Sequence, residues 1–167
     1  MAERPIVVYG DPVLREKSQE VENFDRELKD LVSDMTDTLH KAKGLGLAAV
    51  QVGVLLRVFL VDLSAVEITE KLRVFVNPEI IKTEGEIEYE EGCLSFPGIY
   101  QKITRASKVT AKAFDDNGMP FEITVEGLAA RAILHEFDHL EGKLFIDYLT
   151  PLTRTLLTGK LKKLVQA

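Results

Sequence analysis

Two of the three histidines in the chain lie four residues apart, in the stretch LHEFDHLEG over residues 134–142. Residues at this spacing share one face of an α-helix, so the side chains of His135 and His139 would point the same way. Two neutral imidazoles in this arrangement can hold a divalent ion, and Glu136 between them would project towards water at that ion. The stretch therefore predicts a helix that carries part of a metal site.

The surrounding residues support a helix from Gly127 to Glu141, because apolar residues share one stripe with both histidines. This stripe consists of Leu128, Ala132, His135 and His139. Solvated histidines are the weaker interpretation, since an apolar stripe is buried and unpartnered imidazoles are costly to bury. A catalytic ion normally takes three protein ligands and leaves one position for water. The residue types leave four candidates for the third ligand: His40, Glu91, Cys93 and Glu141.

Composition narrows the class of protein. The 167 residues, 46% of them hydrophobic, suit a single domain over 1–167. No run approaches about 20 apolar residues, and the opening MAERPIVVYGDP does not resemble a signal peptide, so we expect a cytoplasmic protein without membrane contact. Acidic residues (27) outnumber basic ones (21), which argues against sequence-specific nucleic-acid binding. The single cysteine excludes a disulfide framework.

Hydrophobic periodicity predicts an α+β fold with mostly antiparallel sheet. A helix is expected from Phe24 to Ala42, and a last helix begins after Thr150 and Pro151. The turn at 115–118 predicts a hairpin. Short runs rich in β-branched and aromatic residues predict strands at 57–63, 72–78, 108–115 and 121–127.

The glycine-containing stretch GLGLAAVQVG, residues 44–53, superficially fits a dinucleotide-binding pattern. That pattern must follow a strand and open a helix, whereas here it follows a predicted helix and leads into a strand. The sequence instead favours a flexible loop whose small residues allow close approach to the backbone.

Taken together, three segments resemble the motifs of the peptide deformylase family. They are GLGLAAVQ at 44–51, EGCLS at 91–95 and HEFDHL at 135–140. The resemblance runs nearly end to end. It implies antiparallel sheets packed around a central metal-binding helix, with an N-terminal and a C-terminal helix. It also implies an amide hydrolase that removes the formyl group from the N-terminal formylmethionine of nascent polypeptides and releases formate.

The resemblance further implies roles for individual residues. Cys93, His135 and His139 would hold the metal, and Glu136 would act as general acid and base towards water that attacks the formyl carbon. The Gln51 amide and the Leu94 backbone N–H would stabilise the oxyanion. The substrate would contact Gly46, Leu45, Tyr89, Leu128, Arg131 and Ala132. The family's native ion is Fe(II), which Zn(II) or Ni(II) can replace.

Two positions depart from the family pattern. Leu134 stands where glutamine is usual, and we expect altered packing, or altered support of the metal-site residues, rather than lost chemistry. Tyr100 stands where some members carry arginine, which leaves contacts beyond the first substrate residue open.

Glu91 and Arg105 are expected to form an ion pair near Cys93, with a pair of solvated charges as the alternative.

The C-terminal segment 150–167 contains basic but no acidic residues. An apolar stripe of Leu152, Leu156, Leu161 and Leu164 is expected along it. The resemblance implies a helix that can reach the ribosome, and a packed helix with a wet basic face is the alternative. We expect a monomer.

Two other functions share part of this pattern. A zinc endopeptidase also carries HExxH, although no further downstream ligand pattern is present here. A structural metal domain would close its site with four protein ligands and would have no need of Glu136. A formylated methionyl peptide and a longer unformylated peptide would separate the enzymatic candidates.

Overall fold

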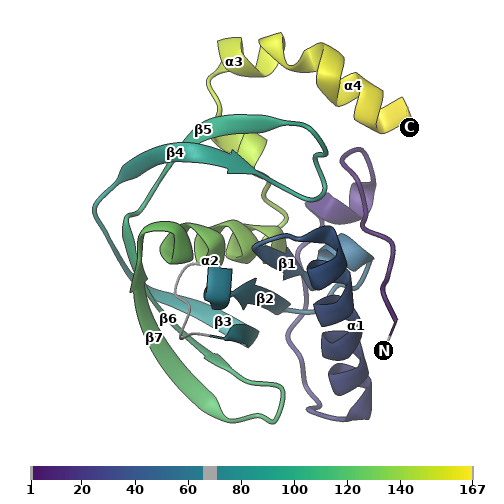
Figure 1. The fold of residues 1–167 in the computed structure, drawn as a ribbon, viewed down its shortest axis with the longest axis vertical. Coiled ribbons are helices and arrows are strands. Elements are labelled where there is room, and N and C mark those ends of the chain that lie inside the picture. The colour runs from purple at the N-terminus through teal and green to yellow at the C-terminus, as the bar shows by residue number, and fades with distance from the viewer. Residues whose placement is uncertain (1, 66–70, 167) are drawn as a thin grey trace.

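The computed structural model describes residues 2–65 and 71–166. A helix, α2 (Gly127–Leu140), lies between a five-stranded sheet and a two-stranded sheet (Figure 1). Within the described residues, the neighbouring strands of both sheets pair antiparallel. The larger sheet, in spatial order, contains β1 (Gly46–Ala48), β2 (Val58–Asp62), β3 (Leu72–Glu84), β6 (Lys108–Phe114) and β7 (Pro120–Glu126). The smaller sheet pairs β4 (Ile87–Gly92) with β5 (Tyr100–Arg105).

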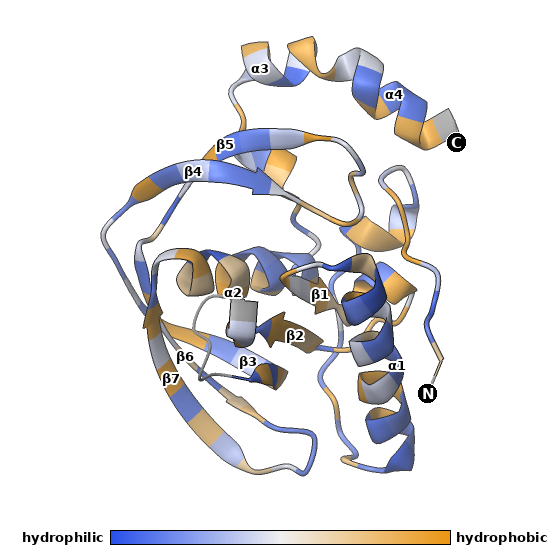
Figure 2. Cartoon of the chain, viewed as in Figure 1, coloured by the Kyte–Doolittle hydropathy of each residue, from blue (hydrophilic) through white to orange (hydrophobic). Residues whose placement is uncertain are grey.

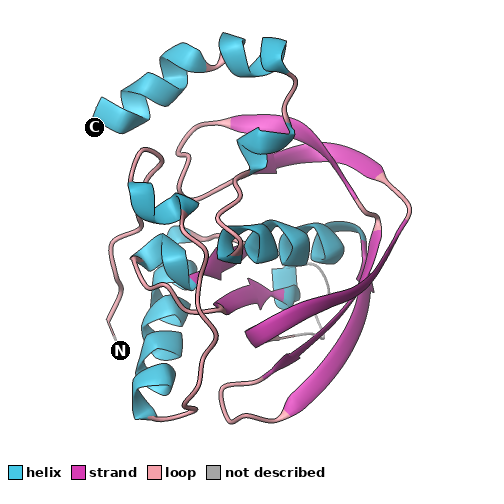
Figure 3. Cartoon of the chain, turned by 180° about the vertical axis from the view of Figure 1, so that it is seen from behind, coloured by secondary structure: helices cyan, strands magenta, loops and turns pink. Residues whose placement is uncertain are grey.

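The other helices flank these layers, as the view from behind also shows (Figure 3). They are α1 (Arg26–Ala42), α3 (Pro151–Leu156) and α4 (Thr158–Gln166). Helix α1 begins where the Asp25 side chain accepts a hydrogen bond from the Leu28 N–H, and it ends at Lys43 in the left-handed conformation. The expected α+β class with antiparallel sheets around a central helix is confirmed.

Strand β2 is buried on both faces, which explains its unbroken apolar run. Val58 and Leu60 pack into a cluster with the apolar face of α1. Phe59 and Val61 alternate with them and pack into the cluster that contains the buried residues of α2. The sheet is therefore held between the two helices. The apolar side of α2 faces this sheet, while α1 turns polar residues outward (Figure 2).

A third apolar cluster fixes β4 and β5 on the other side of α2. It joins Ile103 of β5 to Phe145 in a short 3-10 helix (Phe145–Tyr148) and to Leu161 of α4. The rings of Phe96 and Phe145 meet edge to face, with centroids 5.0 Å apart. This cluster holds the smaller sheet over α2 without direct pairing to the larger sheet.

The expectation of a flexible loop over 44–53 is wrong for most of that stretch. Gly46–Ala48 forms the edge strand β1, whose Gly46 pairs with Val61, and Ala49–Val52 forms a 3-10 helix. Leu47 and Ala48 are fully buried. A strand of three residues is too short to show a period of two in the sequence.

The expected C-terminal stripe is also wrong in part. The segment breaks at Leu157 into α3 and α4, so residues on either side no longer share one helical face. Leu152 and Leu156 are 71% and 76% exposed, whereas Leu157 and Leu161 are buried in the third cluster. Among residues 2–65 and 71–166, no helix combines the length and apolar character that crossing a bilayer requires.

Candidate metal centre

Helix α2 presents both histidines to the end of β4. The Cys93 sulfur, one ring nitrogen of His135 and one of His139 lie within 4.8 Å of one another. The Cys93 Sγ and the His139 Nε2 are 3.4 Å apart. Of the four candidates for a third ligand, Cys93 is the one that forms a group with both histidines in the described part of the chain.

The other three candidates have different positions. His40 is exposed near the end of α1. Glu141 pairs with Arg57 at 2.7 Å. Glu91 meets the far side of the His135 ring, where its Oε2 lies 2.6 Å from Nδ1. This contact leaves Nε2 of His135 for an ion and fixes the orientation of the ring.

The residues fit a divalent cation. One thiolate and two imidazoles suit zinc and iron, and three protein ligands leave a position for water. The Glu136 side chain is only 4% exposed, and its Oε1 has no hydrogen-bond partner among the described residues. A buried carboxylate oxygen without a partner is costly unless an ion or water meets it.

The pKa values of the three α2 groups reflect burial and mutual charge. Burial lowers the pKa of His135, but the charges of Cys93 and Glu136 outweigh this effect and raise it well above its usual value. Burial and the charge of His135 lower the pKa of His139, which favours the neutral imidazole. Burial raises the pKa of Glu136 to about 7. Negative charge on Cys93 and Glu136 thus favours positive charge at His135, whereas His139 favours the neutral form.

Glu91, which contacts His135, is the centre of a buried ionic network. Arg105 donates two hydrogen bonds to the Glu91 carboxylate at 2.8 and 2.7 Å, which confirms the expected ion pair and excludes solvated charges. Burial raises the pKa of Glu91, but hydrogen bonds from Arg105 and His135 outweigh it and hold that pKa below its usual range. Arg105 also donates to Asp138 of α2 at 2.9 Å, and the Tyr148 hydroxyl donates to the same carboxylate oxygen at 2.6 Å.

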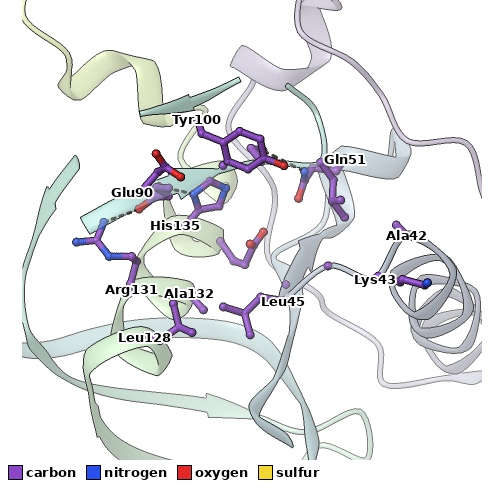
Figure 4. Close-up of a pocket in the computed structure, with 17 residues that line it drawn as sticks. Ala42, Lys43, Leu45, Gln51, Glu90, Tyr100, Leu128, Arg131, Ala132 and His135 are labelled. Atoms are coloured by element: carbon purple, nitrogen blue, oxygen red, sulfur yellow. Dashed lines mark hydrogen bonds and ion pairs between the residues drawn. The ribbon is translucent and has the colours of Figure 1, made fainter. Parts of the chain in front are cut away.

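A cavity of about 330 Å3 opens onto this centre (Figure 4). Most of the predicted site residues line it. They are Leu45, Gly46, Gln51, Cys93, Leu94, Leu128, Arg131, Ala132, His135 and Glu136. His139 lies behind them, buried. Tyr89 is not among the lining residues and is 59% exposed on β4, so the structure does not bring it to the cavity.

Gln51 is held in one orientation. Its Oε1 accepts a hydrogen bond from the Ala48 N–H at 3.0 Å, which turns Nε2 towards Cys93 Sγ at 3.5 Å and Ser95 Oγ at 3.1 Å. The side chain is 1% exposed. An amide donor is therefore fixed beside the ligand group. Leu94, which directly follows Cys93, lines the same cavity.

Three residues that contact the site were not predicted from the sequence: Ser95, Asp138 and Tyr148. Ser95 and Asp138 lie inside the motif segments, and that location is the only sequence feature that could have indicated them. Leu134 is partly buried and packs against the apolar cluster beneath α2. Tyr100 lines the cavity, and its ring covers Gly92 so closely that a Cβ there would lie 2.5 Å from the ring carbon Cε1.

The group of Cys93, His135 and His139 lies close to the unpartnered carboxylate of Glu136 and the fixed amide of Gln51, an arrangement typical of a metal-dependent hydrolase. Comparison with known proteins identifies which kind. Residues 3–155 match the model of the family described as polypeptide deformylase. The chain therefore belongs to the polypeptide deformylase family, whose members remove the formyl group from the N-terminus of nascent peptides.

Individual relatives agree with this assignment. Peptide deformylase of Syntrophobacter fumaroxidans is 46% identical over 98% of this chain and 96% of its own length. That of Clostridium botulinum is 51% identical over 90% of this chain and 99% of its own. The crystal structure of a peptide deformylase from Legionella pneumophila superimposes with a TM-score of 0.91 at 50% identity, covering 97% of this chain and 95% of that one. Because the chain belongs to this family, the two alternatives, a zinc endopeptidase and a structural metal domain, are rejected.

Gly46 allows a test of how closely β1 must approach α2. A Cβ on Gly46 would lie 2.8 Å from the Glu136 Oε2, so Gly46→Ala forces the carboxylate to shift. We expect formate release to fall on the order of 10²-fold, because a displacement of about 1 Å can cost that much. Bound metal, measured by elemental analysis, should not change.

The control is Gly159→Ala in α4, where a Cβ would meet nothing within 4 Å. It should retain wild-type turnover. Full activity in Gly46→Ala would contradict the need for this close approach.

Proposed function

We propose that Cys93, His135 and His139 hold the ion and that Glu136 moves the proton in deformylation. The observation that carries the proposal is the buried Glu136 oxygen without a partner, on a cavity that also exposes Cys93 and His135. The same carboxylate lies against Gly46 of β1, where a Cβ would be 2.8 Å from its Oε2. No other carboxylate lining the cavity has an unpartnered buried oxygen among the described residues.

The ion is proposed to be Fe(II), with Zn(II) or Ni(II) able to replace it, as the family resemblance implies. Ligand softness alone does not choose among these ions. When bound, such an ion lowers the pKa of water and polarises a carbonyl oxygen. The role of the protein is to hold it with three side chains and to keep one position open.

Glu136 would take a proton from the attacking water and return it to the amine that leaves. As the formyl carbon becomes tetrahedral, negative charge develops on its oxygen. The Gln51 Nε2 and the Leu94 N–H would donate hydrogen bonds to that oxygen, and losing one such donor typically costs about 10²–10³ in rate. The hydrogen bond from the Ala48 N–H supports this role, because it keeps the amide nitrogen of Gln51 turned inward.

The methionine side chain would enter between Leu45, Leu128 and Ala132, which line the apolar part of the cavity. Selectivity for formyl over acetyl cannot rest on the burial of one methyl group, which is worth only about 1–3 kcal/mol. We assign it to steric exclusion close to the ion, where Gly46 and Glu136 line the cavity.

Replacing Glu136 tests the mechanism directly. Glu136→Ala should lower formate release from formyl-Met-Ala-Ser by about 10²–10⁴-fold, the usual contribution of a general acid and base. The variant should still bind one equivalent of metal, because no ligand is removed. The assay is run anaerobically with the Fe(II)-loaded enzyme, and the acetylated peptide serves as the substrate control.

Glu122→Ala on the larger sheet is the matched control, since its carboxylate lies outside this cavity. It should behave as wild type. A metal-replete Glu136→Ala enzyme that keeps most of its rate would refute the proposed proton transfer.

We also propose a monomer that works in the cytoplasm and contacts the ribosome through α4. Lys160, Lys162 and Lys163 are exposed on this helix, and α3 adds the exposed Leu152 and Leu156. Changing the three lysines to glutamate should abolish co-sedimentation with bacterial ribosomes in low salt, while deformylation of a free peptide continues. Unchanged co-sedimentation would exclude contact through this face.

A further inference from the structure

The Glu91 carboxylate receives four hydrogen bonds, which fill both of its oxygens. Oε1 accepts from Arg105 Nε and from Arg131 Nη1, each at 2.8 Å. Oε2 accepts from Arg105 Nη2 at 2.7 Å and meets His135 Nδ1 at 2.6 Å. Glu91 is 6% exposed, so water competes little for these contacts.

The family resemblance places Arg131 in the pocket for the substrate side chain, where an apolar wall residue would be expected. Its observed contacts are polar instead. Its guanidinium bridges two partners, because Nη2 donates to the Ile87 carbonyl oxygen at 2.8 Å while Nη1 donates to Glu91. The residue is 4% exposed. In Figure 4 the guanidinium of Arg131 points away from Leu45, in keeping with its hydrogen bond to Glu91. Its polar end is therefore engaged with β4 and not directed at the centre of the cavity.

Arg131 and His135 are four residues apart on α2, so the helix presents both to the same strand. Arg105 reaches the carboxylate from β5. Without the hydrogen bond from Arg131, Glu91 Oε1 would keep only its contact with Arg105 and would become open to water from the cavity. With both arginines, the carboxylate is tied to β5 and to α2, and its Oε2 has one position relative to the His135 ring.

We propose that Arg131 is a positioning residue that acts through Glu91 to fix the His135 ring for metal binding. This inference rests on the proposed ligand role of His135. Partners behind a metal-binding histidine orient the ring, and their loss typically weakens metal affinity about 10–100-fold. Lysine cannot replace arginine fully, because a single ammonium group does not reproduce the planar fork that spans Glu91 and Ile87.

The test measures Zn(II) affinity of the full chain by competition with a chromophoric chelator. Arg131→Met keeps much of the side-chain length but removes both hydrogen bonds, and it should weaken Zn(II) binding roughly 10-fold. Arg131→Lys should lose less. If Arg131→Met does not fold, Arg131→Lys carries the comparison alone, with an expected loss of at least threefold relative to wild type.

A double-mutant cycle with Glu91→Gln tests whether Arg131 acts through Glu91. Once Glu91 is changed, Arg131→Met should weaken Zn(II) binding little further. Losses that multiply in the double variant would show that Arg131 acts by another route and would overturn the inference.

Two controls separate positioning from packing. Leu128→Ala enlarges the same cavity without contacting Glu91, so it should raise KM for formyl-Met peptides and leave Zn(II) affinity unchanged. Arg15→Met removes another two-point arginine contact, with Asp147, and should also leave Zn(II) affinity unchanged. Arg131→Met should instead lower kcat and metal affinity together.

A folded Arg131→Met variant with wild-type Zn(II) affinity and a raised KM would assign Arg131 to the substrate wall and overturn the inference. Zn(II) affinity is measured without turnover, so failure of the proposed function can be distinguished from failure of this inference. In that case the wild-type protein would bind Zn(II), with the Arg131 variants weakened as expected, but Fe(II)-loaded protein would release no formate.

Discussion

The buried carboxylate of Glu91 is the contact on which the site depends. It joins β4, β5 and α2 through hydrogen bonds of 2.6 to 2.8 Å. A carboxylate is buried without large cost only when all its hydrogen-bonding positions are filled, and here two guanidinium groups and one imidazole fill them. This requirement fixes where β4 ends relative to α2. Cys93, two residues after Glu91, is thereby brought to the two histidines.

The rest of the fold makes α2 a rigid support. Its apolar side packs on the larger sheet, and the alternating residues of β2 fasten that sheet to α1 behind it. The polar side of α2 then carries His135, Glu136 and His139 at a fixed spacing. The edge strand β1 closes the arrangement, because Gly46 approaches Glu136 without a side chain between them. Packing on one side and ionic contacts on the other thus determine the geometry of a single helix.

The sequence predicted the parts of the molecule that carry strong local patterns. The periodicity of α1 and α2, the apolar strands and the three motif segments were sufficient to predict the fold class and the grouping of Cys93 with His135 and His139. Strands β4 and β5 were missed because most of their side chains are exposed, and their pairing depends on a cluster built from distant segments. The break at Leu157 and the orientation of Arg131 were missed for a similar reason, since tertiary contacts decide both.

The proposed site requires one sulfur and two imidazole nitrogens to converge on a single ion. X-ray absorption at the zinc edge of the fully loaded protein measures these contacts. We expect one Zn–S distance of about 2.3 Å, two Zn–N distances of about 2.0–2.1 Å and one lighter ligand from solvent. A spectrum without a sulfur contribution, or one unchanged by Cys93→Ala, would contradict it.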